Sequence, residues 1–249
     1  GMTYEIRLEH VSFRYPGADK NTLTDIDLTL HPGEKLAILG SNGAGKTTTL
    51  RMLATLIRPD SGDAVLSGSS VVTQPEEVRR KIGFLTSELK LEDFFTPDYL
   101  YDFFSELYGI PADRRDARKR MLFARFGIQE FAQVRVRDLS TGMKQKVSLV
   151  ISLVQDPEII IFDEPTNGLD ILTAKVVTDF LLDLKEQGKT IIVSTHIFSL
   201  VEKICDRVGI IINGRMAACE DLWILCGDKS LEDRFFEIYE AVNGEEENH

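Results

Sequence analysis

The stretch from Lys35 to Thr49 reads KLAILGSNGAGKTTT and decides the fold. Its first five residues are of strand length and apolar after Lys35, and a loop with three glycines separates them from a segment with a helical pattern. Glycine lets the backbone bend with its N–H groups pointing inward, and a helix that begins directly after the loop adds the positive end of its dipole. This strand–loop–helix order predicts an anion site on an α/β fold.

The loop fits the motif G-x-x-x-x-G-K-[ST], which cradles the phosphates of a nucleotide. Backbone amides would surround the phosphates, the Lys46 ammonium would reach the outer ones, and the Thr47 hydroxyl would ligate Mg²⁺. The alternative is a glycine-rich turn without a ligand, and the flanking strand and helix argue against it. The candidates for cofactor binding in this segment are Gly40, Ser41, Asn42, Gly43, Ala44, Gly45, Lys46, Thr47 and Thr48.

A second apolar strand, Ile159–Phe162, ends in two adjacent acids, Asp163 and Glu164. Ligands of open α/β sheets bind beyond the carboxyl ends of the strands, so we expect both acids beside the phosphate loop. Asp163 would hold Mg²⁺, and Glu164 would polarise the attacking water. Two solvated acids at a strand end are the alternative, which the upstream phosphate loop makes less favourable.

His196 follows the next expected strand, Thr190–Ser194, and would lie near the same phosphates. A neutral imidazole can donate a hydrogen bond to the γ-phosphate. His10, His31 and His249 have no motif around them and receive no role. The catalytic candidates are therefore Lys46, Glu164 and His196.

The order of apolar segments predicts the architecture. Strands alternating with helices indicate a mainly parallel sheet covered on both faces, after an N-terminal antiparallel β subdomain. Helices are expected over Thr47–Ile57 and Ala174–Gln187, and Asn213-Gly214 favours a hairpin turn. We expect one domain over 2–249, with a nucleotide-binding core in 2–87 and 156–220 and a helical insertion in 88–155. A C-terminal helix and an acidic tail, frayed from Gly244, complete the expected organisation in 221–249.

Composition excludes several classes of protein. A net charge of −11 argues against sequence-independent nucleic-acid binding, which needs clustered Lys and Arg. Three cysteines, an odd number without zinc-site spacing, indicate reduced thiols rather than a disulfide framework. No apolar run approaches the roughly 20 residues that cross a bilayer. If the protein works on a membrane, another chain must span it.

Further segments resemble the ATP-binding cassette, or ABC, family. Leu139–Gln145, with the sequence LSTGMKQ, is similar to the signature motif of that family. Asn167–Asp170, directly after the acids and Pro165-Thr166, looks like its D-loop. Tyr15 lies where the family keeps an aromatic ring that stacks on adenine. Together these motifs cover nearly the whole chain, and they imply the ABC ATPase fold around a P-loop NTPase core.

The resemblance implies a head-to-tail dimer held together by ATP and Mg²⁺. Ser140 and Gly142, at the start of a helix, would face the γ-phosphate bound to the other subunit, because a helix N-terminus attracts anions. Tyr15, Ser140, Gly142 and Asp170 are thereby added to the cofactor-binding candidates. An ordinary N-cap by Ser140 is the alternative, and the two readings are compatible.

The sequence departs from the family pattern at two places. The signature has Thr141 and Met143 where Gly and Gln are commonest. The family also places a Gln, as a ligand of magnesium and water, after the strand that corresponds to Ile82–Leu85. Ser87 occupies the aligned position and becomes the third metal candidate beside Thr47 and Asp163, with Glu88 as the alternative.

Within the family, Leu139–Lys146 and Ser230–Phe236 are similar to small bacterial exporter ATPases of the sodium-efflux and multidrug types. This implies an ATPase on the cytoplasmic face of the cell membrane, peripheral to an integral membrane transport subunit and paired with a second ABC ATPase subunit. Family logic places the docking surface near Thr86–Tyr108. That segment carries an aromatic cluster of Phe94, Phe95, Tyr99, Tyr101, Phe103 and Phe104, some of which must belong to the core.

Two other functions compete with this hypothesis. A soluble ABC-type ATPase that acts on ribosomes or DNA typically has two cassettes or a coiled-coil insertion, and this sequence has one cassette and no heptad run. A GTPase or small-molecule kinase would leave the signature motif unexplained, and no guanine-reading Asn-Lys-x-Asp motif is present. No nucleic-acid partner is expected.

Overall fold

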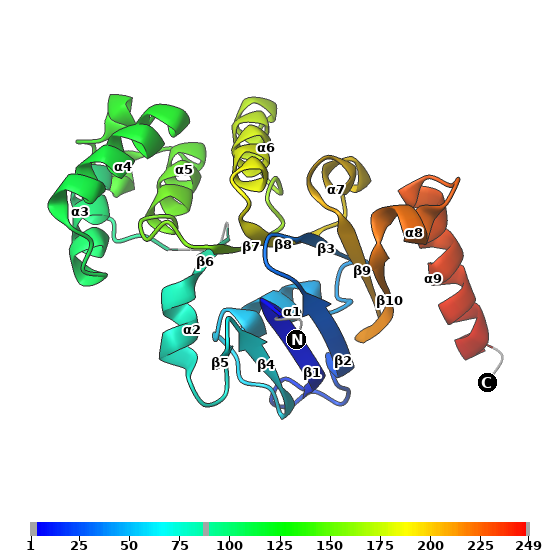
Figure 1. The fold of residues 1–249 in the computed structure, drawn as a ribbon. Coiled ribbons are helices and arrows are strands. Elements are labelled where there is room, and N and C mark those ends of the chain that lie inside the picture. The colour runs from blue at the N-terminus through cyan, green and yellow to red at the C-terminus, as the bar shows by residue number, and fades with distance from the viewer. Residues whose placement is uncertain (1–3, 87–89, 248–249) are drawn as a thin grey trace.

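The computed structural model describes residues 4–86 and 90–247, and its strands form two sheets (Figure 1). In the larger, six-stranded sheet, all neighbours are parallel except the edge strand β10, which pairs antiparallel with β9. This confirms the mainly parallel sheet predicted from the sequence. In sheet order the strands are β10 (Arg215–Asp221), β9 (Arg207–Ile212), β3 (Lys35–Leu39), β8 (Thr190–Thr195), β7 (Ile159–Asp163) and β6 (Ile82–Leu85).

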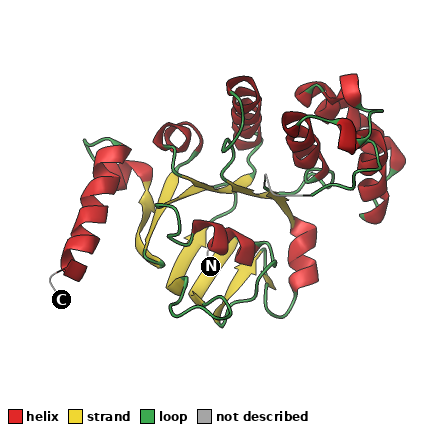
Figure 2. Ribbon diagram, turned by 180° about the vertical axis from the view of Figure 1, so that it is seen from behind, coloured by secondary structure: helices red, strands yellow, loops and turns green. Residues whose placement is uncertain are grey.

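The smaller sheet is antiparallel, as expected for the N-terminal part of the chain. Apolar residues alternate along its strands, so one face is buried while the other meets solvent. The buried face is turned toward helix α1 (Lys46–Leu53), which lies between the two sheets (Figure 2). The order of the strands is β2 (Leu23–Leu30), β1 (Ile6–Phe13), β4 (Ser61–Leu66) and β5 (Ser69–Ser70).

Two apolar layers cover the opposite faces of the larger sheet. Along β3, Leu36 belongs to the layer shared with α1 and the smaller sheet. Its neighbour Ala37 belongs to the other layer, with helices α6 (Ile171–Glu186) and α7 (Phe198–Ile204). Because successive side chains of a strand point to opposite faces, a strand buried at every position, such as β3, requires cover on both sides.

The remaining helices lie at the two ends of the larger sheet (Figure 1). Helices α3, α4 and α5 lie together beyond β6, whereas α8 and α9 lie beside β9 and β10. Their bounds are α2 (Pro75–Lys81), α3 (Pro97–Leu107), α4 (Ala112–Phe126), α5 (Thr141–Ile151), α8 (Leu222–Cys226) and α9 (Leu231–Glu247), with short 3₁₀ helices at Ile128–Phe131 and Val136–Asp138. Among the described residues, no helix combines the length and hydropathy needed to span a bilayer.

Helix α1 is shorter than the predicted Thr47–Ile57, because it ends at Leu53. The chain turns directly afterwards, where Thr55 has a φ of +67° and donates its backbone N–H to the Met52 carbonyl. A left-handed backbone conformation at a β-branched residue is uncommon. Leu56 and Ile57 keep the apolar spacing of a helix although they lie beyond its end, so the pattern predicted too long a helix.

Two other helix boundaries differ from prediction, and one turn agrees. Helix α6 begins at Ile171 rather than Ala174, because Asp170 caps its N-terminus. The prediction that the tail frays from Gly244 is wrong, because α9 continues to Glu247. Asn213 and Gly214 have φ of +51° and +76° between β9 and β10, which confirms the predicted hairpin turn.

Candidate functional site

The phosphate loop joins β3 to α1, and two of its glycines are required by close contacts. A Cβ on Gly45 would lie 2.6 Å from Leu23 Cδ2, and one on Gly40 would lie 2.7 Å from the Ile211 carbonyl oxygen. Gly45 also has a φ of +113°, which side-chain-bearing residues rarely adopt. The smaller sheet, through Leu23, and strand β9, through Ile211, therefore pack against the loop and restrict its conformation.

The loop opens onto a cavity of about 600 Å³ that brings together most of the predicted site. Of the predicted loop residues, Gly40 and Ala44 are buried behind its wall, and Ser41 is exposed outside it. The cavity is lined by Tyr15, Thr22, Asn42, Gly43, Gly45, Lys46, Thr47, Thr48, Thr86, Asp163, Glu164, Asn167 and His196.

Lys46 is nearly buried, with 5% of its side chain exposed, and its ammonium group has two oxygen partners. Nζ donates a hydrogen bond of 2.7 Å to the Gly40 carbonyl and lies 3.1 Å from Glu164 Oε1. A buried ammonium needs such partners, because an unpaired charge loses its hydration without compensation. The lysine is therefore held inside the cavity, next to the amides of the loop.

Asp163 receives hydroxyl hydrogen bonds from two elements. Thr47 Oγ1, in the first turn of α1, donates to Asp163 Oδ1 over 3.2 Å, and Ser194 Oγ, on β8, donates to the same oxygen over 2.6 Å. Strands β7 and β8 are in register here, with Asp163 opposite Ser194. A hydroxyl and a carboxylate side by side supply the hard oxygen ligands that Mg²⁺ prefers, so Thr47 and Asp163 could hold this ion.

Glu164 adopts a left-handed backbone conformation, with a φ of +49°. Its N–H donates to both the carbonyl oxygen and the Oγ of Ser194, at 3.0 and 3.1 Å. Its carboxylate lies between the Lys46 ammonium and His196, whose Nδ1 is 3.2 Å from Oε2. A carboxylate only accepts, so this contact is a hydrogen bond when Nδ1 carries a ring proton.

Tyr15 forms one wall of the cavity. Its hydroxyl lies 3.0 Å from Thr48 Oγ1, and the Phe13 ring packs edge-on against it at 4.8 Å between centroids. These contacts fix a half-buried aromatic ring beside the loop, in a position where its face could stack on a planar base.

The sequence reasoning missed four residues at this site. Thr22, Thr86 and Asn167 line the cavity, and Ser194 supports both acids from behind it. Asn167 follows the acids closely, so its place along the chain was a usable signal. Ser194 closes an apolar strand and stands two residues before His196, yet nothing in its spacing distinguishes it from a buried serine without a role.

Three further predicted cofactor contacts, on α5 and α6, also lie outside this cavity. Ser140 is exposed and caps α5, accepting a 3.2 Å hydrogen bond from the Met143 N–H, and Gly142 is half-buried in the first turn of the same helix. Asp170 caps α6, and hydrogen bonds from the Thr173 backbone and hydroxyl lower its pKa. Ser87, the third metal candidate, and Glu88 fall outside the described residues.

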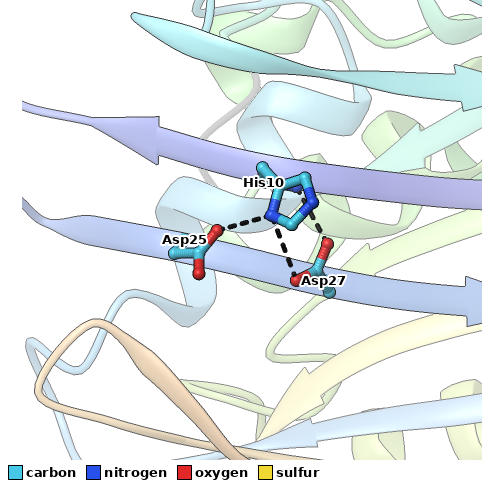
Figure 3. A group of neighbouring side chains, drawn as sticks. All are labelled: His10, Asp25 and Asp27. Atoms are coloured by element: carbon cyan, nitrogen blue, oxygen red, sulfur yellow. Dashed lines mark hydrogen bonds and ion pairs between the residues drawn. The ribbon is translucent and has the colours of Figure 1, made fainter.

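His10, to which the sequence gives no role, forms a surface cluster with Asp25 and Asp27 (Figure 3). Its Nδ1 lies 2.7 Å from Asp25 Oδ1 and 3.6 Å from Asp27 Oδ2. The hydrogen bond to Asp25 and the negative charge of Asp27 raise the pKa of the imidazole. All three side chains are exposed on the smaller sheet, and they form an ion pair when the imidazole is protonated.

Comparison with known proteins agrees with this geometry. The family described as "ABC transporter" matches residues 23–167. The ABC transporter ATP-binding protein NatA of Bacillus subtilis is 41% identical, over 85% of this chain and 87% of its own length. The Nod factor export ATP-binding protein I of Burkholderia lata is 35% identical, over 80% of this chain and 66% of its own.

Two solved structures share the fold. One, described as the ATP-binding subunit of an ABC transporter, has a TM-score of 0.87 at 28% identity and covers 95% of this chain and 99% of its own. The other is a dimeric ATP-binding cassette in a post-hydrolysis state with ADP and phosphate. It has a TM-score of 0.77 at 26% identity, over 87% of this chain and 98% of its own. The chain therefore belongs to the ABC transporter family of ATP-binding proteins and is an ATPase.

Proposed function

We propose that this ATPase binds MgATP in the cavity beside the phosphate loop, hydrolyses it within a head-to-tail dimer, and thereby drives export through a separate membrane protein. The observation that carries the proposal is the convergence of the loop amides, Lys46, Asp163, Glu164 and His196 on one cavity. These groups come from three parallel strands whose carboxyl ends meet at one edge of the sheet, where α/β folds bind ligands.

Each group has a distinct part in the proposed reaction. The loop amides and Lys46 bind the phosphates, and Tyr15 stacks on the adenine. Thr47 and Asp163 would hold Mg²⁺, which would supply positive charge against the outer phosphates. Glu164 accepts a hydrogen bond from the attacking water and polarises it, while His196 donates to the γ-phosphate. No covalent intermediate is needed, because positioning and electrostatics account for most of phosphoryl-transfer catalysis.

The proposed dimer is supported by a surface next to the site. Ile171 and Leu172, in the first turn of α6, are 87% and 79% exposed. They follow Asp170 directly, and the N-terminus of α5, with Ser140 and Gly142, is also open to solvent. A second copy placed head to tail would cover these residues and bring its α5 N-terminus to the γ-phosphate. The dimeric cassette among the similar structures supports this arrangement.

The proposed membrane partner has a candidate docking surface on α3 and on the turn that precedes it. Phe94, Phe95, Tyr99 and Phe103 are exposed, and the ring of Tyr99 stacks at 4.5 Å on Phe95 and at 6.3 Å on Phe103. Tyr101, two residues from Tyr99, is fully buried in the core, so the aromatic cluster of the sequence divides between core and surface. A row of exposed aromatic rings is typical of a protein-binding face.

Export is the direction that the similar proteins favour, since the relative from Burkholderia lata is a Nod factor export protein. We place the chain on the cytoplasmic side of the cell membrane, where ATP is available.

The test combines catalysis with capture of the partner. The affinity-tagged chain, extracted with its complexes from the membranes of its own cells in mild detergent, should carry an integral membrane protein in fixed proportion and hydrolyse ATP only with Mg²⁺. Magnesium-dependent hydrolysis without any membrane partner, with the chain recovered on ribosomes or DNA instead, would overturn the transport part. Absence of hydrolysis from an intact complex would overturn the assigned site.

A further inference from the structure

We propose that Ser194 is a positioning residue for hydrolysis, whose single hydroxyl group orients Asp163 and Glu164 together. The inference rests on the proposed roles of those two acids and extends them to a residue that touches neither nucleotide nor metal. Ser194 lies on β8, is 0% exposed and is absent from the lining of the cavity.

The hydrogen bonds of Ser194 have fixed directions. Its Oγ accepts from the Glu164 backbone N–H, which can only donate, over 3.1 Å. The one hydroxyl hydrogen is then free for Asp163 Oδ1, which can only accept when ionised, and the 2.6 Å separation is that of a charge-assisted bond. One buried group therefore joins the side chain of the first acid to the backbone of the second.

For Asp163, the Ser194 contact differs from the Thr47 contact. Both hydroxyls donate to Oδ1, but Thr47 lines the cavity, whereas Ser194 approaches from the buried interior of the sheet. A metal in the cavity can take over the Thr47 hydroxyl without disturbing the bond from Ser194. Ser194 is thus suited to hold the carboxylate in the same orientation before and after the metal binds, as the hydrogen-bond partners of metal ligands do.

For Glu164, the Ser194 contacts stabilise an unfavourable backbone. A non-glycine residue at a φ of +49° needs surroundings that hold it there. The Glu164 N–H is shared between the carbonyl oxygen and Oγ of Ser194, so the backbone and the side chain of one residue both stabilise this turn. The turn directs the carboxylate toward Lys46 and His196, inside the cavity. Loss of Oγ would leave the Glu164 N–H with one of its two acceptors, and the Glu164 carboxylate would be held less rigidly.

The test compares Ser194→Ala with a matched variant, Ser105→Ala. Ser105 on α3 is also fully buried, and its hydroxyl has no hydrogen-bond partner within the described residues, so the control removes the same atom without a positioning role. Ser194→Thr keeps the hydroxyl group. If Ser194→Ala prevents folding, Ser194→Cys, whose thiol is only a weak donor, replaces it. Thermal unfolding identifies which variants are folded.

Two measurements separate positioning from a merely structural effect. Titration of Mn²⁺ by its spectroscopic signal, in the presence of ADP, measures the metal affinity without turnover. Steady-state hydrolysis measures kcat and its dependence on Mg²⁺. We expect Ser194→Ala to lower both the metal affinity and kcat by about 10- to 100-fold. Binding of ATP in the presence of EDTA should be unchanged, and Ser194→Thr should recover both losses.

The outcomes are distinct. If Ser194→Ala, or Ser194→Cys in its place, equals wild type in metal affinity and kcat, the inference is wrong. It is also wrong if Ser105→Ala shows the same loss of metal affinity. Failure of the wild-type protein to bind Mn²⁺ with ADP would instead overturn the proposed function itself.

Discussion

The ammonium group of Lys46 lies 3.1 Å from the carboxylate of Glu164, so the phosphate-loop lysine and the proposed water-polarising acid form an ion pair. Both side chains are largely shielded from solvent, with 5% and 18% exposed. A triphosphate bound to the loop amides would compete with Glu164 for the lysine, because it carries more negative charge than a single carboxylate. Nucleotide binding is therefore expected to transfer Lys46 to the phosphates and release Glu164 for the water.

Replacing Lys46 by alanine should weaken ATP binding by about 10- to 100-fold, the range for loss of a charged hydrogen bond. The change also leaves the Glu164 carboxylate without its cation partner in the cavity, which adds repulsion toward the phosphates. Titration with a fluorescent ATP analogue measures the affinity. Lys175→Ala, at an exposed lysine of α6, is the control and should bind as wild type. An unaltered affinity of Lys46→Ala would refute the phosphate role.

Glu164→Gln should reduce kcat by about 10²- to 10⁴-fold, the usual contribution of a general base, while ATP binding persists. The amide keeps the shape of the side chain but no longer carries its charge. Because the nucleotide is not consumed, dimers should accumulate with MgATP in gel filtration. Glu158→Gln changes an exposed glutamate just before the opposite end of β7 and should keep full activity. Wild-type turnover by Glu164→Gln would show that another group polarises the water.

The His10 cluster predicts a pH dependence of stability. Because Asp25 and Asp27 raise the folded-state pKa of His10 above its usual value of 6.5, the protonated histidine stabilises the folded chain. That contribution is complete below pH 6.5 and is lost as the pH rises through the raised pKa. His10→Asn should therefore lower the Tm at acidic pH more than at alkaline pH. Asp25→Asn should reduce the same difference, because it removes the hydrogen bond to the imidazole but leaves the charge of Asp27. An equal Tm loss at every pH would contradict the assignment.

Gly62 in β4 should tolerate no side chain. A Cβ there would lie 2.3 Å from the His10 carbonyl oxygen and 2.4 Å from that of Glu9, and the φ is +78°. Gly62→Ala should lower the free energy of unfolding in urea by about 2–4 kcal/mol, from backbone strain plus overlap. Gly68→Ala is a matched control, with a φ of +83° but open space around the Cβ, and should cost only about 1 kcal/mol. Equal losses in the two variants would disprove the steric part.

The parts of the site that the sequence predicted are those with a strong local signal. The glycine spacing of the loop and the acids at the end of an apolar strand specify where each segment lies, and parallel strands bring their carboxyl ends together. Lys46, Asp163, Glu164 and His196 meet in one cavity for this reason.

The parts that it missed depend on tertiary contacts. Tyr99 and Tyr101 lie on the same helix, and the packing of α3 against α4 and α5 decides which is buried. Tyr101 packs edge-on against Phe123 of α4, at 5.6 Å between ring centroids. Ser194 has a role only because β7 and β8 pair in register. Helix α1 ends early where Thr55 takes a left-handed backbone conformation, which the spacing of apolar residues does not predict.

The most direct test of the central claim is a crystal structure of Glu164→Gln with MgATP. The account predicts the phosphates against the backbone amides of residues 43–47, with Lys46 Nζ moved from position 164 to the outer phosphates and the metal between Thr47 and Asp163. A nucleotide bound elsewhere, or a cavity without phosphates in which Lys46 still contacts the side chain at position 164, would contradict it.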